Sequence, residues 1–201
     1  MIYLIGLTGN VATGKSLVAR ILSDLGAHVI DADALVHELE RQGTPVYDAV
    51  VAEFGADILR ADGEIDRAKL GSLVFSDPEA LRRLEIIVHP AVGAEIERRL
   101  SGFRPPTSNI RTVVVIEAVK LIEAGLDKRC DALWVVTCRP GLQLDRLVHT
   151  RGLGERDARL RIVVQPPQSE KAALADVLIE NNGTVDELRA QVKHHWERIP
   201  S

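Results

Sequence analysis

The residues with the clearest chemical signature form a glycine-rich turn near the start of the chain. Residues 9–16 read GNVATGKS and match the pattern G-x-x-x-x-G-K-[ST] at each fixed position. Such a turn binds an anion when it follows a buried strand and opens a helix, because backbone N–H groups and the helix N-terminus then surround the ligand. The turn predicts a site for the phosphates of a nucleoside triphosphate.

Each position of this phosphate-binding loop (the P-loop, residues 9–16) has an expected role. Lys15 is expected to reach the β- and γ-phosphates and to take part in catalysis, and the Ser16 hydroxyl is the expected ligand of Mg²⁺. The other residues of the expected ATP site in this region are Gly9, Asn10, Val11, Ala12, Thr13, Gly14 and Leu17.

Two aspartates after the second apolar run predict the chemistry of the phosphoryl acceptor. Residues 31–33 read DAD. Ligands of open α/β sheets bind outside the carboxyl ends of the strands, so Asp31 and Asp33 are expected to face the phosphates. A carboxylate there accepts the proton of an alcohol but repels a phosphate, which favours an alcohol acceptor. Asp31 could instead cap the following helix, and both roles can hold.

A run of arginines around a glycine-containing turn predicts a basic lid over the nucleotide. Residues 143–161 read QLDRLVHTRGLGERDARLR. Arginine binds phosphate oxygens bidentately, and a hinged segment between two helices can close and exclude water. We expect Arg146 and Arg151 to act on phosphates, whereas Arg159 is expected on a solvated helix face beside acidic partners.

Apolar runs predict the elements that position these groups. Runs at 2–7, 28–30, 112–117, 132–137 and 175–180 are typical of buried strands, and residues 15–25 have helical spacing. A strand, a helix and a second strand within about thirty residues indicate a parallel sheet. The predicted fold is therefore α/β: a three-layer P-loop NTPase fold with about five parallel strands, a helical insertion and a helical lid.

The middle third of the chain has helical patterns and no comparable strand. We predict a nucleotide-binding core of residues 1–33 and 108–201, with the lid at about 143–170, and a helical substrate-binding insertion of residues 34–107. The stretch 102–109, GFRPPTSN, is typical of a loop.

Composition narrows the class of protein. The 201 residues carry a formal net charge of −4, so no overall positive charge attracts nucleic acid or an anionic membrane. No apolar stretch approaches the ~20 residues of a membrane span, and no signal peptide is expected before the P-loop. Cys130 and Cys138 flank one predicted strand, too far apart for a disulfide, which favours a reducing cytoplasm and cysteines that serve as small buried hydrophobic side chains.

The residues leave open a kinase of a small molecule with a large acceptor lobe, a kinase of a smaller alcohol, and a non-catalytic module that binds ATP. The N-K-x-D of a GTPase and the L-S-G-G-Q of an ABC ATPase do not occur in the chain, and small-molecule kinases remain. A kinase of a smaller alcohol, of the shikimate type, predicts a smaller acceptor lobe than the long helical middle third. A non-catalytic module that senses ATP has no need of the Asp33 carboxylate.

The order of the motifs resembles the dephospho-coenzyme A kinase family. The resemblance rests on LTGNVATGKS, GAHVIDADALV, VHP, QLDRL and ADVLIENNG, and it covers essentially the whole chain. It implies ATP-dependent phosphorylation of the ribose 3′-hydroxyl of dephospho-CoA, the last step of CoA synthesis. The expected partners are these small molecules, with no nucleic acid and no membrane, for a monomer or a small homo-oligomer.

The resemblance also implies roles for single residues. Asp33 would be the general base, Arg146 and Arg151 would belong to the ATP site, and Asn181 would lie near the adenine. His89 in the helical lobe would bind the CoA moiety, although the residues alone leave open that it marks a junction where Pro90 ends a helix. The expected substrate site is completed by Thr8, Asp31, Glu117 and Lys120.

The chain departs from the family pattern at three places. Residues 117–123 read EAVKLIE, where the family usually has D-x-P-L-L-x-E, so Glu117 replaces Asp, Val119 replaces Pro and Lys120 replaces Leu. We expect Lys120 either to disturb acceptor contacts or to add a phosphate contact. Lys171 stands where the family usually has arginine, and the P-loop interior NVAT is less rich in glycine than usual.

Replacement of Lys15 by alanine tests the role of the P-loop. Because the variant loses the positive charge expected at the β- and γ-phosphates, we predict that Lys15→Ala weakens nucleotide binding and abolishes turnover together. Nucleotide titration and a turnover assay on the same preparation measure both. A variant with normal turnover would exclude the phosphate role.

Overall fold

The computed structural model of the chain describes residues 2–103 and 112–200. These residues divide into two compact units, one formed by the residues up to Asp31 together with those after Phe103, the other by Ala32–Phe103. Most of the loop predicted over residues 102–109, and the predicted boundary between residues 107 and 108, lie outside the described residues. The two units are described separately.

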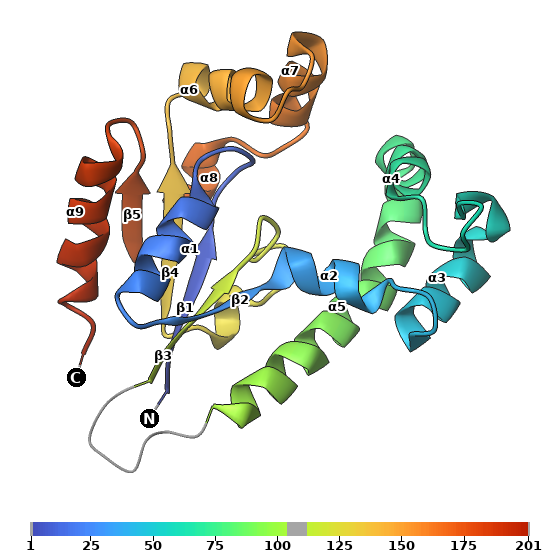
Figure 1. Cartoon of the computed structure of the whole chain (residues 1–201), viewed down its shortest axis with the longest axis horizontal. Helices are drawn as coiled ribbons and strands as arrows, with labels where there is room; N and C mark the ends of the chain where they lie inside the picture. Colours follow the sequence, from blue (N-terminus) through green and yellow to red (C-terminus); the bar gives the residue numbers. More distant parts are fainter. Residues whose placement is uncertain (1, 104–111, 201) are drawn as a thin grey trace. The chain divides into compact units, whose positions relative to one another are not determined.

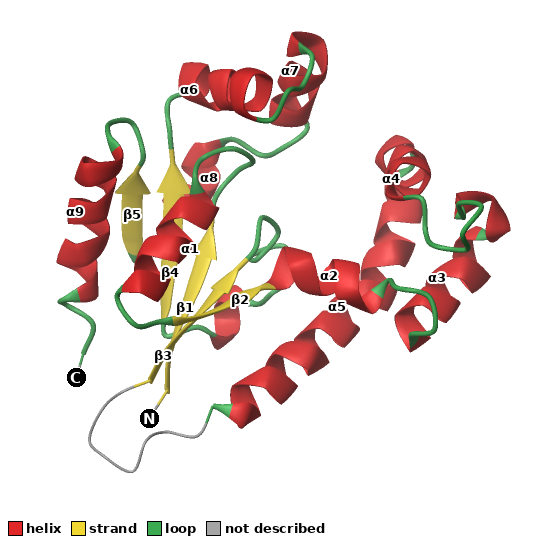
Figure 2. Ribbon diagram, in the orientation of Figure 1, coloured by secondary structure: helices red, strands yellow, loops and turns green. Residues whose placement is uncertain are grey.

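The first unit is built on a five-stranded parallel sheet (Figures 1 and 2). Its strands lie in the order β2-β3-β1-β4-β5, and every pairing is parallel. They are β1 (Ile2–Thr8), β2 (His28–Asp31), β3 (Thr112–Glu117), β4 (Ala132–Thr137) and β5 (Val177–Glu180). The predicted α/β fold with its five strands is therefore confirmed, with strand ends that differ by two residues or fewer.

Both faces of this sheet are covered, since alternate residues of a strand point to opposite sides. On one face, apolar residues of β1, β3 and β4 pack with α1 (Lys15–Asp24) and α9 (Val185–Trp196). On the other face, a side chain at Gly6 would collide with Leu121 and Cys130. The segment between β3 and β4, which includes the short helix η2 (Asp127–Arg129), therefore packs closely on this side of β1.

The predicted lid segment consists of short helices separated by a turn that contains glycine. Its elements are α6 (Pro140–Asp145), the π-helical turn η3 (Arg146–Thr150), α7 (Glu155–Val163) and α8 (Gln168–Ala172). Gly152 lies between η3 and α7 with a φ of 68°. Leu147 and Ala158 form a small apolar cluster with Ala12 of the P-loop, so the segment packs directly on that loop.

The second unit is helical, as its sequence pattern predicts. Its elements are α2 (Ala32–Leu39), α3 (Pro45–Phe54), η1 (Ala56–Ile58), α4 (Arg67–Ser76) and α5 (Pro78–Gly102). Leu59 and Ile65 form an isolated antiparallel bridge. Helix α5 continues through Pro90, so the alternative that Pro90 ends a helix at His89 is wrong. Proline removes one backbone donor, and the remaining hydrogen bonds of this long helix keep it continuous.

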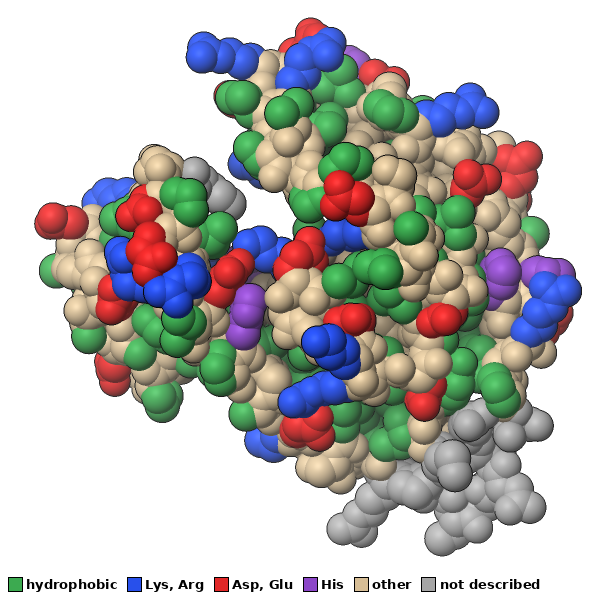
Figure 3. Space-filling model, turned by 180° about the vertical axis from the view of Figure 1, so that it is seen from behind, with side chains coloured by type: hydrophobic (Ala, Val, Ile, Leu, Met, Phe, Trp, Pro, Cys, Tyr) green, Lys and Arg blue, Asp and Glu red, His purple; other side chains and the backbone are tan. Residues whose placement is uncertain are grey.

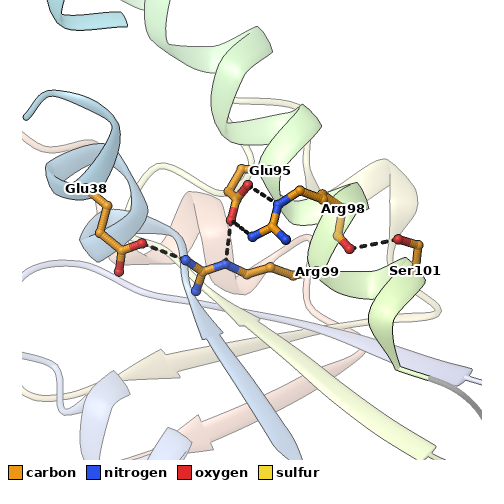
Figure 4. A network of polar contacts seen from close by, with 5 residues as sticks. All are labelled: Glu38, Glu95, Arg98, Arg99 and Ser101. Carbon is orange, nitrogen blue, oxygen red and sulfur yellow. Dashed lines mark hydrogen bonds and ion pairs between the residues drawn. The ribbon is translucent and has the colours of Figure 1, made fainter. Parts of the chain in front are cut away.

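A network of charged side chains connects α2 to α5 within the second unit (Figure 4). Arg99 donates to Glu38 at 2.6 Å and to Glu95 at 2.9 Å. Arg98 donates both Nε and Nη2 to Glu95 at 2.7 Å. Hydrogen bonds from Arg98 and then Arg99 lower the pKa of Glu95 to about 2. The carboxylate at the centre of the network therefore stays charged at neutral pH, and α2, which carries Asp33, is held against α5.

The surface carries charges of both signs. On the face drawn in Figure 3, acidic and basic side chains are interspersed and form no continuous basic patch. Among the described residues, no helix is both long enough and apolar enough to cross a membrane.

Candidate active site

The P-loop lies between β1 and α1, which is the setting that its sequence motif requires. Gly9 and Gly14 adopt φ values of 150° and 100°, in a region that side chains disfavour. A Cβ at Gly9 would collide with the Val136 carbonyl, and one at Gly14 would collide with the Asn181 amide. Both glycines are therefore required by backbone conformation and by close neighbours.

Ala12 is the point at which the P-loop interior departs most from a glycine-rich loop. Its φ of 59° lies in the left-handed region, where a residue other than glycine costs about 1 kcal/mol. Its methyl group is buried against Leu147 of η3 and Ala158 of α7. This packing offsets part of the backbone strain and attaches the P-loop to the lid segment.

Arg146 and Asn181, both predicted to meet ATP, lie together on the P-loop. Arg146 donates Nη1 to the carbonyl oxygens of Ala12 and Thr13 at 3.3 and 3.1 Å, and Nη2 to the Asn181 carbonyl at 3.1 Å. The Asn181 side chain donates to the Thr13 carbonyl at 2.9 Å. The guanidinium charge therefore lies directly beside the loop expected to bind phosphates. The roles of the two residues toward phosphate and adenine stay predictions.

Val11 is held at both of its polar backbone atoms. Its N–H donates to Oε1 of Gln165 at 2.9 Å, and its carbonyl accepts from Nε2 of Gln143 at 2.7 Å. The neighbouring Asn10 donates Nδ2 to the Pro166 carbonyl at 2.8 Å, while its buried Oδ1 has no partner within the described ranges. Residues from both ends of the lid segment thus form hydrogen bonds with Asn10 and Val11 at the tip of the P-loop.

Sequence reasoning gave Gln143 no role, although its side chain is 1% exposed. Only an indirect feature of the sequence could have indicated that Gln143 is buried and hydrogen-bonded. A glutamine stands between Leu142 and Leu144, and a fully buried glutamine requires hydrogen-bond partners.

Ser16 and Glu117 come together at the carboxyl edge of the sheet. The Ser16 hydroxyl donates to Oε1 of Glu117 at 2.8 Å, and Glu117 is 6% exposed at the end of β3. Asp31 ends β2 directly beside Glu117 in the parallel register. Lys15 is buried, with Nζ 3.4 Å from the Asn10 carbonyl. The structure therefore gathers a lysine, a hydroxyl and two carboxylates around the start of α1.

The unusual residues after β3 form a compact polar cluster. The carbonyl of Val119 accepts from the Thr8 hydroxyl at 3.2 Å and from Lys171 Nζ at 2.5 Å. Lys171 is buried and pairs with Glu123 at 3.1 Å, so the lysine found in place of arginine is fully engaged. Lys120 is exposed in the same turn. Thr8 and Lys171 thus hold the loop that follows Glu117.

The other predicted residues have different surroundings. Arg151 is exposed directly after η3, and Leu17 lies in the first turn of α1. Arg159 pairs with Glu155 at 2.6 Å on the exposed face of α7, which confirms the prediction of a solvated helix face. Asp33 and His89 belong to the second unit.

In the second unit, Asp33 is exposed in the first turn of α2, and His89 is half-buried in α5. Asp31 immediately precedes α2, in the position that a capping residue occupies.

Both cysteines are free thiols. Burial raises the pKa of Cys130 to about 12, with a further contribution from Asp127 and Asp131. Burial also raises the pKa of Cys138, although Arg146 opposes the shift. The reactive thiolate is therefore scarce at neutral pH. Cys138 is buried, as predicted, whereas Cys130 is half-buried.

Comparison with known proteins decides the family. Residues 3–187 match the family model described as dephospho-CoA kinase. The chain belongs to the dephospho-CoA kinase family. The resemblance found in the sequence motifs is thereby confirmed. A curated family member, the dephospho-CoA kinase of Symbiobacterium thermophilum, is 46% identical over 193 residues, which are 96% of this chain and 80% of that protein.

Solved structures agree with this assignment. The dephospho-CoA kinase from Campylobacter jejuni is 25% identical, with a TM-score of 0.69. The match covers 98% of the chain described here and 96% of the Campylobacter chain. A crystal structure from Thermus thermophilus is 30% identical with a TM-score of 0.84, covering 99% and 98%. A shikimate kinase from Acinetobacter baumannii, 18% identical with a TM-score of 0.51 over 98% and 92%, shares the fold alone. The predicted P-loop kinase fold is therefore confirmed.

Proposed function

We propose that this protein transfers the γ-phosphoryl group of ATP to the ribose 3′-hydroxyl of dephospho-CoA, giving CoA and ADP in the final step of CoA biosynthesis. The observation that carries the proposal is the grouping of Lys15, Ser16 and Glu117 around the P-loop of a chain that belongs to the dephospho-CoA kinase family. The extensive helical unit, Ala32–Phe103, favours an acceptor larger than shikimate.

The P-loop is the proposed binding site for the ATP phosphates. Its glycines allow backbone N–H groups to converge, and the N-terminus of α1 adds a positive dipole. Lys15 is proposed to neutralise charge on the β- and γ-phosphates. Arg146 supplies a second positive charge beside the loop. These groups stabilise the charge that develops on the transferring phosphoryl group.

Ser16 and Glu117 have the chemistry required for Mg²⁺. This ion prefers oxygen ligands and usually takes one or two from the protein, with the remainder from phosphates and water. The hydroxyl and carboxylate lie 2.8 Å apart, whereas no cluster of three acidic, histidine or cysteine residues that could hold a metal occurs in the described part of the chain. Bound Mg²⁺ would neutralise phosphate charge. We therefore propose Glu117 as a ligand of the metal, while its contact with the substrate stays a prediction.

Asp33 is the proposed general base. Its carboxylate is exposed in the first turn of α2, two residues along the chain from the end of β2. It would accept the proton of the 3′-hydroxyl as that oxygen attacks the γ-phosphorus and ADP leaves. The helical unit, with His89 on α5, is proposed to bind the CoA moiety.

Cysteine usage and surface charge support proposals for the location and the partners of the protein. Two free thiols support a cytoplasmic location. The mixed charges in Figure 3 support small molecules rather than nucleic acid as partners. We propose a monomer or a small homo-oligomer.

A direct assay tests the function. Purified protein with Mg-ATP should convert dephospho-CoA to CoA, with the new phosphate on the 3′-oxygen as detected by mass spectrometry and ³¹P NMR. Shikimate serves as the competing acceptor. Phosphorylation of shikimate without phosphorylation of dephospho-CoA would favour the alternative hypothesis of a kinase that acts on a smaller alcohol. ATP binding without transfer to either acceptor would favour a sensing module.

Replacement of Asp33 by asparagine tests the general base. The amide keeps the size of the side chain but cannot accept the proton, so turnover should fall by roughly 10²-fold or more while ATP binding survives. Steady-state kinetics and nucleotide titration on the same variant separate the two effects. Unchanged turnover would remove Asp33 from the mechanism.

Replacement of Glu117 by glutamine tests the metal site. The amide oxygen can still accept from Ser16, but the negative charge is lost, so the Mg²⁺ concentration for half-maximal activity should rise by roughly 10- to 100-fold. Glu123→Gln is the matched control, because Glu123 pairs with Lys171 instead. An equal Mg²⁺ requirement in both variants would contradict the metal role.

A further inference from the structure

We propose that Gln143 is a positioning residue for the phosphate site, oriented by Gln168. Gln143 turns one P-loop carbonyl outward, and this turns the next backbone N–H toward the bound nucleotide. The proposal rests on the proposed binding of ATP to the P-loop, and it concerns residues to which neither the sequence motifs nor the resemblance assigns a role.

Two hydrogen bonds fix the orientation of the Gln143 amide. Its Nε2 donates to the Val11 carbonyl at 2.7 Å, and its Oε1 accepts from Nε2 of Gln168 at 3.2 Å. An inverted amide would place oxygen against the Val11 oxygen and nitrogen against the Gln168 nitrogen. Because both contacts would then be lost inside the protein, one orientation of the amide is strongly favoured.

Gln168 is itself held by the backbone of Cys138. Its Oε1 accepts from the Cys138 N–H at 3.0 Å, and its Nε2 donates to the Cys138 carbonyl at 3.0 Å. Cys138 directly follows β4, so this paired contact extends from the carboxyl end of a central strand. A chain of amides therefore runs from the sheet through Gln168 and Gln143 to the tip of the P-loop.

The direction of the Ala12 N–H follows from the geometry of the peptide bond. In a planar trans peptide, the carbonyl and the following N–H point in opposite directions, and the described residues contain no cis peptide. Gln143 holds the Val11 carbonyl on the side of the lid segment. The Ala12 N–H must therefore point to the opposite side, away from Gln143.

Neighbouring P-loop peptides repeat this arrangement. Arg146 holds the Ala12 and Thr13 carbonyls, and Asn181 adds a second donor to Thr13. By the same argument, the Gly14 N–H points away from Arg146 and Asn181. Three successive carbonyls are thus bound from outside the loop. The Thr13 N–H donates to the Asn10 carbonyl at 3.4 Å, so the Ala12 and Gly14 N–H groups are the ones proposed for phosphate oxygens.

Gln143 is the least exposed of the three side chains that donate to these P-loop carbonyls. Gln143 is 1% exposed, and its removal would leave the part-buried Val11 carbonyl without its donor. The peptide would then gain by rotating toward any other donor, and the Ala12 N–H would turn with it. The cost should therefore fall on phosphate binding rather than on binding of the nucleoside.

The experiment is isothermal titration of MgADP and of AMP into the full-length protein and its variants. We expect Gln143→Leu to weaken MgADP binding about tenfold, the scale of one lost hydrogen bond to a charged group, while AMP affinity changes less than about twofold. Gln168→Leu should weaken MgADP binding about threefold, because the Gln143 amide loses its orienting partner but keeps its own donor.

Gln191→Leu is the matched control. Gln191 makes the same paired contact with a backbone, donating to the Glu180 carbonyl at 3.1 Å and accepting from its N–H at 3.2 Å. It is half-buried like Gln168, but both of these hydrogen bonds go to the end of β5 and neither goes to a P-loop carbonyl. Its ratio of MgADP to AMP affinity should equal that of the unmodified protein.

The outcomes separate this proposal from the proposed function. If the unmodified protein does not bind MgADP, the kinase function fails. If it binds MgADP but Gln143→Leu keeps the same ratio of MgADP to AMP affinity, the positioning role is overturned. Equal losses for both nucleotides would also overturn it, since they indicate general damage. Should circular dichroism show Gln143→Leu to be unfolded, the ratio measured for Gln168→Leu decides.

Discussion

The outward orientation of the P-loop carbonyls is the constraint on which the candidate site depends. A loop whose N–H groups converge on an anion must turn its carbonyl oxygens the other way, and those oxygens need donors of their own. Gln143, Arg146 and Asn181 provide them from α6, η3 and the end of β5. The proposed phosphate site is therefore a product of distant parts of the chain as much as of the P-loop motif.

The parallel sheet places the remaining chemistry at one edge. Parallel strands end together, so Asp31 and Glu117 lie side by side at the ends of β2 and β3, and Ser16 reaches Glu117 from the start of α1. The loop after Glu117 is held by Thr8 and Lys171. Lys171 and the Val119 carbonyl, at positions that differ from the usual family pattern, thus make internal contacts here, whereas Lys120 is exposed. An acidic group beside Ser16 is kept.

The glycine-poor interior of the P-loop has a structural counterpart. Ala12 accepts a strained backbone, and its methyl group joins an apolar cluster with Leu147 and Ala158. Val11 also forms hydrogen bonds with Gln143 and Gln165. Together with this packing, they attach the lid segment directly to the P-loop. Arg146, expected from sequence to act on phosphates, also donates a hydrogen bond to the Ala12 carbonyl of the P-loop.

Local patterns were enough to predict the strands, the P-loop setting and the helical middle third. Apolar runs and glycine positions report directly on burial and on backbone conformation, which are properties of short segments. The solvated position of Arg159 followed in the same way from the acidic residue one helical turn before it. The continuity of α5 through Pro90 did not follow, because the surrounding helix outweighs a local breaking signal.

The amino-acid sequence by itself therefore determined the fold class, the phosphate motif and the family resemblance. Only the tertiary structure decided which side chains hold the P-loop, since the motifs give no contact for Gln143 or Gln168, which lie 25 residues apart. The tertiary structure also showed that the Ser16 hydroxyl donates a hydrogen bond to Glu117. The physical reason is that hydrogen bonds between distant segments depend on strand order and helix packing, which no short stretch of sequence encodes.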